Sequence, residues 1–104
     1  MDRMTRLKEM LAQQPEDNFL RHALALEYLK INHRAEARTL FESILTDSPD
    51  YIGSYYHLAL LLAETGEKET AISWYEKGME AARQAGDRHA LSELQAAYEA
   101  LTEE

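Results

Sequence analysis

The sequence predicts an all-α fold made of repeated antiparallel helix hairpins, with about six helices. Among its 104 residues are 15 alanines and 15 leucines but no valine, a composition that favours helices over strands. Apolar residues recur at helical spacing, as in Leu20, Leu24 and Tyr28. The chain also matches itself at an offset of 34 residues, which indicates a helical-repeat protein.

The internal match aligns two copies of one unit. The aligned pairs are Pro15 and Pro49, Leu24 and Leu58, Ala25 and Ala59, Ala37 and Ala71, and Phe41 and Tyr75. Helices before and after these copies continue the series as incomplete units. We therefore expect one domain, 1–104, with full repeats over 18–51 and 52–85 and half-repeats over 3–14 and 88–102.

The first three predicted helices span residues 3–14, 18–31 and 34–47. Pro15 separates the first from the second, and Asp17 and Asn18 are good N-cap residues for the second. The dipeptide Asn32-His33 supplies the turn of a hairpin. The third helix then presents an apolar face that includes Ala37 and Phe41.

The last three predicted helices span residues 50–65, 67–85 and 88–102. Ser48-Pro49-Asp50 is expected to open the fourth helix, whose segment 58–63 is apolar on all sides and therefore fits a position between neighbouring helices. Thr65-Gly66 marks the next turn. Gly86 is expected to stop the fifth helix, and Asp87 to cap the sixth.

Composition excludes several function classes. Eleven Lys and Arg against nineteen Asp and Glu give a net charge of −8, which repels nucleic-acid phosphates. No apolar run approaches the roughly 20 residues that span a bilayer. The absence of cysteine excludes a disulfide scaffold, a thiolate zinc site and a cysteine nucleophile. We expect a soluble, cytoplasmic protein with neither nucleic acid nor membrane as a partner.

Catalytic and metal-binding patterns are not apparent. The four histidines lie far apart on separate predicted elements, and the four glycines are too widely spaced for a phosphate-binding loop. His89 and Ser92 share one helix face, but no orienting carboxylate or oxyanion site is suggested. The sequence therefore predicts no enzyme, no metal and no cofactor.

The repeat resembles the tetratricopeptide repeat (TPR) family, whose pattern places Trp, Leu-Gly and Tyr on the first helix, Ala and an aromatic on the second, and Pro before the next hairpin. The corresponding residues are Arg21, Leu24-Ala25, Tyr28, Ala37, Phe41 and Pro49 in the first unit, and Tyr55, Leu58-Ala59, Leu62, Ala71 and Tyr75 in the second. The resemblance covers nearly the whole chain and implies a right-handed α-solenoid.

Three residues depart from the family pattern. Arg21 replaces the first aromatic, Gly78 lies mid-helix where a small apolar residue is usual, and Arg83 stands where the closing proline would be. Without that proline, the fifth helix is expected to run about one turn further. Trp74 points off the packing face. We expect a neighbouring helix to cover part of it, with an exposed anchor on the convex side as the alternative.

The resemblance also implies a concave groove that receives a peptide or helical segment of another protein. By position, the groove residues would be Phe19, His22, Leu26, Lys30, Tyr56, Leu60, Glu64 and His89. The Lys and Asn with which some TPR co-chaperones hold a terminal carboxylate are replaced here by His22, Leu26, Tyr56 and Leu60. Two alternatives stay open: plain packing of Leu26 and Leu60 between hairpins, and self-association of the stack ends as a homo-oligomer or assembly protein.

The last predicted helix is acidic. Its charged residues are Asp87, Glu93, Glu99, Glu103 and Glu104 against Arg88. Such a helix is usually the solvated outer face of a terminal repeat. A preference for basic partner peptides is the second interpretation.

Overall fold

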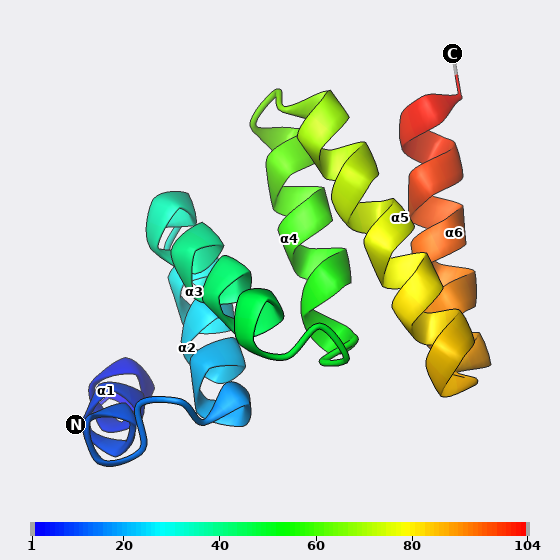
Figure 1. Ribbon diagram of the computed structural model, residues 1–104. Helices are drawn as coiled ribbons and strands as arrows, with labels where there is room; N and C mark the ends of the chain where they lie inside the picture. The colour runs from blue at the N-terminus through cyan, green and yellow to red at the C-terminus, as the bar shows by residue number, and fades with distance from the viewer. Residues whose placement is uncertain (1, 104) are drawn as a thin grey trace.

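The computed structural model describes residues 2–103, which form six α-helices and no strand. The helices are α1 (Arg3–Gln13), α2 (Asn18–Lys30), α3 (Arg34–Asp47), α4 (Gly53–Glu64), α5 (Lys68–Ala85) and α6 (Arg88–Thr102). They follow one another in chain order across a molecule of 44 × 29 × 20 Å, from α1 at one end to α6 at the other (Figure 1). The predicted all-α helical-repeat fold is confirmed.

Local chemistry explains most helix ends as predicted. The side chain of Asp17 accepts a hydrogen bond from the Leu20 amide at 2.9 Å, and Asp87 does the same for Ala90 at 3.0 Å, so both act as N-caps. Asn32 ends the first hairpin's turn with a φ of 62°. Gly86 has a φ of 70°, the left-handed conformation that stops a helix at low steric cost.

The predicted start of the fourth helix at residue 50 is wrong, because α4 begins at Gly53. The hydroxyl of Ser48 accepts a hydrogen bond from the Asn18 side chain at 2.8 Å and so does not cap α4. Residues 48–51 form a turn, in which the Tyr51 amide donates to the Ser48 carbonyl at 2.9 Å. The Tyr55 hydroxyl donates to the Pro49 carbonyl at 2.6 Å and holds this turn against α4.

The core lies between the hairpins and contains the residues of the repeat. Phe41 and Tyr75 are fully buried, as the repeat pattern predicts. Ala25 and Ala59 have no exposed surface, which fits close crossing of the two helices of each hairpin. Burying a large apolar side chain contributes on the order of 1.5–3 kcal/mol, so the repeated positions supply much of the stability.

Both ends of the stack are continuous with this core. Leu7 of α1 is buried in a smaller cluster with Leu20 and Leu24 of α2. α6 packs against α5 and α4 and buries Leu94. On the α3 side, Arg38 forms ion pairs with Glu42 at 3.0 Å and with Glu67 at 2.7 Å, and so connects α3 to the turn before α5. None of the helices between residues 2 and 103 is both long and apolar enough to cross a membrane.

The departures from the family pattern have structural explanations. The guanidinium of Arg21 is buried and donates hydrogen bonds to Ser43 Oγ and Asp47 Oδ2, both at 2.9 Å. At Gly78, an added Cβ would lie 2.7 Å from the Cβ of Tyr55, so only glycine fits this crossing. α5 has 18 residues against 14 in α3, as expected where the closing proline is missing.

Trp74 is half-buried, so the expectation of partial cover is confirmed. Its ring packs against Tyr55 of α4 with the ring centroids 6.1 Å apart. The Nζ atom of Lys77 lies 4.6 Å from the Trp74 ring centroid, in a cation–π contact.

Candidate functional site

Four of the predicted groove residues line one hollow along α2. This first hollow has a volume of about 340 Å³. Its lining residues are Arg3, Phe19, His22, Ala23, Leu26, Glu27 and Lys30. The spacing of Phe19, His22 and Leu26 by three and four residues places them on one face of α2.

A second hollow, of about 450 Å³, lies between α2, α4 and α6. It is lined by His22, Ile52, Gly53, Tyr56, His57, Asp87, His89, Ala90, Glu93 and Leu94. It brings together three predicted residues, His22, Tyr56 and His89. Because His22 lines both hollows, they adjoin, and we refer to them together as the concave groove.

Two predicted residues do not line either hollow. Leu60 and Glu64 follow Tyr56 on α4 at successive helical turns, beyond the second hollow. Leu60 is half-buried and Glu64 is exposed. The concave groove therefore extends less far along α4 than the family positions imply.

The groove keeps large apolar side chains accessible to solvent. Phe19 is 69 % exposed, although it has the size of a core residue. Leu26 and Tyr56 are half-buried and pack partly against the core. None of these three side chains is fully covered by the chain's own helices, so they offer apolar contact area to another molecule.

Aromatic and histidine rings form the surface beneath the groove. The Nδ1 atom of His22 is hydrogen-bonded to Ser54 Oγ at 2.8 Å. The His22 and His57 ring centroids lie 5.5 Å apart, and His57 stacks on Phe41 at 5.9 Å. Tyr51 packs against His22 from the α3–α4 turn, with centroids 5.8 Å apart. These contacts connect the first hairpin to the second.

Burial keeps both histidines of this cluster neutral at pH 7. Desolvation, with a smaller contribution from the neighbouring His57, lowers the pKa of His22 to about 4. Desolvation also lowers the pKa of His57, and the carboxylate of Glu93 opposes that shift. At neutral pH the two rings therefore act as uncharged hydrogen-bonding groups.

The two hollows differ in charge. In the first, the Glu27 carboxylate lies 3.4 Å from Arg3 and 2.9 Å from Lys30, so cations neutralise it. The second contains the carboxylates of Asp87 and Glu93 but no lysine or arginine among its lining residues. His89 lies 3.5 Å from Glu93, with its side chain 86 % exposed.

Sequence reasoning did not place His57, Asp87 or Glu93 in the groove, although it counted both acids in the acidic last helix and Asp87 as its cap. The separation of the histidines along the sequence suggested that they lie apart, but the fold brings His22 and His57 together. One available signal was the spacing of Ser54 and His57, which places them one turn apart on α4. Another was the four-residue spacing of His89 and Glu93 on α6.

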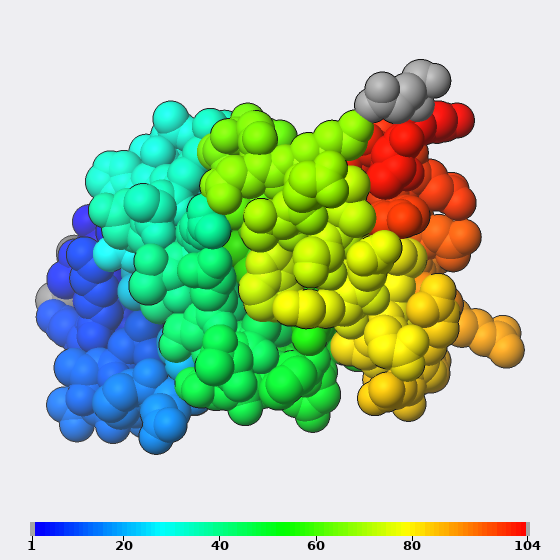
Figure 2. All heavy atoms as spheres, turned by 45° about the horizontal axis from the view of Figure 1, so that its top comes forward, coloured from blue at the N-terminus to red at the C-terminus, as the bar shows by residue number. Residues whose placement is uncertain are grey.

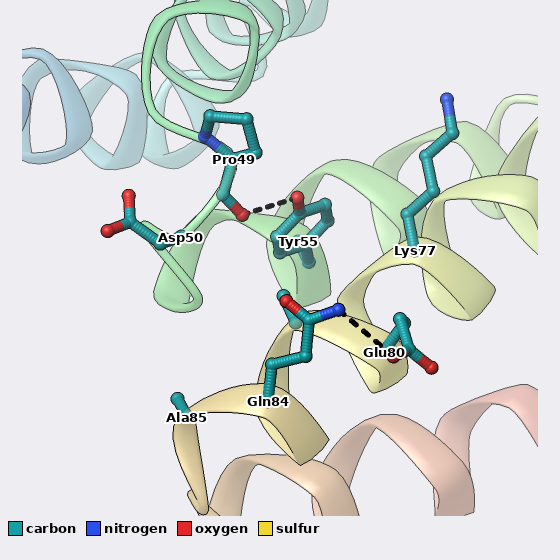
Figure 3. Close-up of a pocket in the computed structure, with 8 residues that line it drawn as sticks. Pro49, Asp50, Tyr55, Lys77, Glu80, Gln84 and Ala85 are labelled. Carbon is teal, nitrogen blue, oxygen red and sulfur yellow. Dashed lines mark hydrogen bonds between the residues drawn. The ribbon is translucent and has the colours of Figure 1, made fainter.

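A further hollow, of about 670 Å³, lies away from all the predicted residues. Its lining residues are Pro49, Asp50, Tyr55, Lys77, Glu80, Ala81, Gln84 and Ala85. Figure 2 shows the surface hollowed between the α3–α4 turn, in green, and the end of α5, in yellow. Figure 3 shows the Tyr55 hydroxyl donating to Pro49 on one side of this α5 hollow, opposite Gln84 and Glu80. The α5 hollow lies where the last turns of α5 extend past the α3–α4 turn (Figure 1).

The described residues include no group of three or more His, Asp or Glu side chains placed to hold a metal ion. Stacked helix hairpins with a groove along the first helices define a helical-repeat protein. A family model described as tetratricopeptide repeat matches residues 52–84. Together with the solved structure of a close relative, this match shows that the chain belongs to the TPR family.

That relative is a tetratricopeptide repeat domain protein from Salinibacter ruber, solved by NMR. It is 43 % identical, with a TM-score of 0.81, over 85 % of this chain and 89 % of the relative. A protein from Bordetella parapertussis is 28 % identical, with a TM-score of 0.83, over 97 % of this chain and 88 % of that one. A MamA protein shares the fold, with a TM-score of 0.74 at 23 % identity over 92 % of this chain and 51 % of MamA.

No curated protein matches the chain. The TPR fold suggests a protein–protein interaction module, and TPR proteins are generally non-enzymatic scaffolds.

Proposed function

We propose that the protein is a non-enzymatic interaction module that binds a peptide or helical segment of a partner protein in the concave groove. The observation that supports this most directly is the 69 % exposure of Phe19 beside a hollow that also contains Leu26. An exposed aromatic side chain that adjoins other accessible apolar side chains in a hollow is typical of an interaction site.

The arrangement of side chains fits peptide recognition. Phe19, Leu26 and Tyr56 offer apolar anchoring surfaces, and interfaces obtain most of their binding free energy from a few such anchors in hollows that exclude water. His22 and His57 add neutral donors and acceptors between the anchors. A helix or an extended segment lying across α2, α4 and α6 would contact all of these groups.

Self-association through the stack ends is the second candidate function. α1 exposes Met10, which is 44 % accessible. The exposed residues of α6 are polar or alanine and include no large apolar side chain. An end-to-end contact would have only the half-buried Leu91, Tyr98 and Leu101 as large apolar side chains on the α6 side, where stable interfaces are usually apolar. The groove is the better-supported binding surface.

The test is affinity capture with the purified chain and two variants. Leu26→Glu with Tyr56→Glu places two charges in the concave groove. Gln84→Glu with Ala85→Glu adds the same charge at exposed positions of α5 and serves as the matched control. All three proteins must show the same helical circular dichroism.

A partner that binds the parent and the α5 control, but not the groove variant, is the expected result. Capture of the same partner by the groove variant would contradict the proposal. If nothing is captured and light scattering shows concentration-dependent self-association of the parent, the stack ends become the binding surface instead.

A further inference from the structure

The concave groove is apolar at one end and acidic at the other. In the first hollow, Phe19 and Leu26 offer apolar surface, and the single carboxylate, Glu27, is already paired with two cations. In the second hollow, the carboxylates of Asp87 and Glu93 have no lysine or arginine beside them among the lining residues. The negative charge that is not paired with a lysine or arginine is therefore concentrated in the second hollow.

Two histidines of the second hollow, His22 and His57, do not cancel this charge at neutral pH. His22 and His57 pack among aromatic rings, and their half-buried surroundings favour the neutral form. His89 is largely in water, with its side chain 86 % exposed. Asp87 and Glu93 give the second hollow a formal charge of −2 when histidines are counted as neutral.

We propose that the occupant of the concave groove is a basic segment with a bulky apolar residue, in which that residue fills the first hollow and a lysine or arginine enters the second. This inference rests on the proposed function of the groove. The cation would meet Asp87 and Glu93 from α6 and the ring of Tyr56 from α4, and an aromatic face also attracts cations. Because the hollows share His22, the two contacting residues lie close together in the partner.

The overall charge supports the same occupant. The net charge of −8 attracts basic segments and repels acidic ones at a distance. Not every acid of α6 contributes to the groove, since Glu99 lines a different hollow together with Glu76. These two glutamates provide an internal control, because they have the same charge outside the groove.

The first experiment selects peptides from a random library displayed on phage. Selection uses the parent chain, and counter-selection uses a Leu26→Ala, Tyr56→Ala variant, which removes apolar contact area from the groove without adding charge. Enriched peptides are expected to have a net positive charge and at least one bulky apolar residue. Enrichment of neutral or acidic peptides would overturn the basic occupant while leaving the groove function intact. No enrichment over the variant would count against both.

The second experiment measures the affinity of one enriched peptide. Asp87→Asn with Glu93→Gln removes both charges, and asparagine keeps the helix cap. We expect affinity to fall about tenfold and to weaken further as salt screens the remaining attraction. Glu76→Gln with Glu99→Gln should bind within about twofold of the parent. Equal affinity of the first variant and the parent would contradict the role of Asp87 and Glu93.

Discussion

The two hairpins solve the same packing problem with different pairs of residues. Arg21 of α2 and Tyr55 of α4 lie 34 residues apart and occupy the same position of the repeat. On the second helices, Ile44 and Gly78 are likewise equivalent positions, 34 residues apart. The first hairpin combines a buried arginine, paired with the half-exposed Asp47, with a large aliphatic residue, whereas the second combines an aromatic ring with a glycine.

This difference shows that the repeat preserves the crossing of the helices rather than the residues that fill it. A ring at Tyr55 leaves no room for a Cβ at position 78, so glycine is required despite its cost of about 1 kcal/mol within a helix. The long side chain of Arg21 instead places its guanidinium near the end of α3, where Ser43 and Asp47 accept its hydrogen bonds. Arg21 with Asp47, and Tyr55 with Gly78, are thus matched pairs, so a change to one member of either pair should be costly.

The largest effect on the free energy of unfolding is expected from acidification. It acts on His22, another position at which the two hairpins differ. His22 corresponds to Tyr56 in the second repeat. The pKa of His22 falls from 6.5 to about 4 on folding, so the unfolded chain binds more protons between these values. Stability is therefore retained above pH 6.5 and lost as the pH falls towards 4, by at most about 3 kcal/mol.

Urea unfolding between pH 7 and pH 4 measures this loss. His22→Gln, which can keep a hydrogen bond to Ser54, should flatten the pH dependence. The matched control is His89→Gln, since His89 is 86 % exposed in its side chain. An unchanged pH dependence in His22→Gln would show that the buried imidazole is not responsible.

Asp47→Ala tests the ion pair of the first hairpin. The side chain of Arg21 is only 7 % exposed, and loss of its counter-charge leaves a buried guanidinium without a carboxylate. We expect a loss of about 2 kcal/mol in the free energy of unfolding. Glu42→Ala removes one carboxylate from Arg38, which is 36 % exposed, and should cost less than about 1 kcal/mol. Equal losses in the two variants would contradict a special role for Arg21.

Gly78→Ala tests the crossing in the second hairpin. The new Cβ would lie 2.7 Å from Tyr55 Cβ, an atom next to the backbone that cannot move cheaply. Overpacking should exceed the gain in helix propensity and leave a net loss of about 1–2 kcal/mol. The comparison is Gly53→Ala, whose Cβ would meet only His22 Cε1 at 4.0 Å. Thermal unfolding should show a lower Tm for the first variant alone.

Tyr55→Phe is expected to have the smallest effect. It removes the hydrogen bond to the Pro49 carbonyl at 2.6 Å but keeps the ring that excludes a Cβ at Gly78. The expected loss in the free energy of unfolding is about 1 kcal/mol, measured by urea denaturation. A loss larger than that of Gly78→Ala would mean that the turn, rather than the ring, determines the packing here.

The repeat was readable from the sequence because its signals are local or periodic. Ala25, Ala59, Phe41 and Tyr75 keep their spacing, and each one is buried as expected. The start of α4 was not readable, because Ser48 is engaged by Asn18, which lies 30 residues earlier in the chain. Such a contact depends on how one helix stacks on the next.

The groove was predictable in part for the same reason. Phe19, His22 and Leu26 share one face of α2, so their helical spacing placed them together. His57 and Glu93 were missed. They line the second hollow together with His22 only because of the way α2, α4 and α6 are placed relative to one another. Glu64 follows the same periodicity but lies outside the hollows, since the groove ends before it.

The most direct test of the concave groove is a map of amide chemical shifts in the ¹⁵N-labelled chain as an enriched peptide is added. We predict that the largest changes fall on α2, α4 and α6 around Phe19, Leu26, Tyr56 and Glu93. Changes concentrated instead around Lys77, Gln84 and Ala85 would place binding in the α5 hollow and contradict the account.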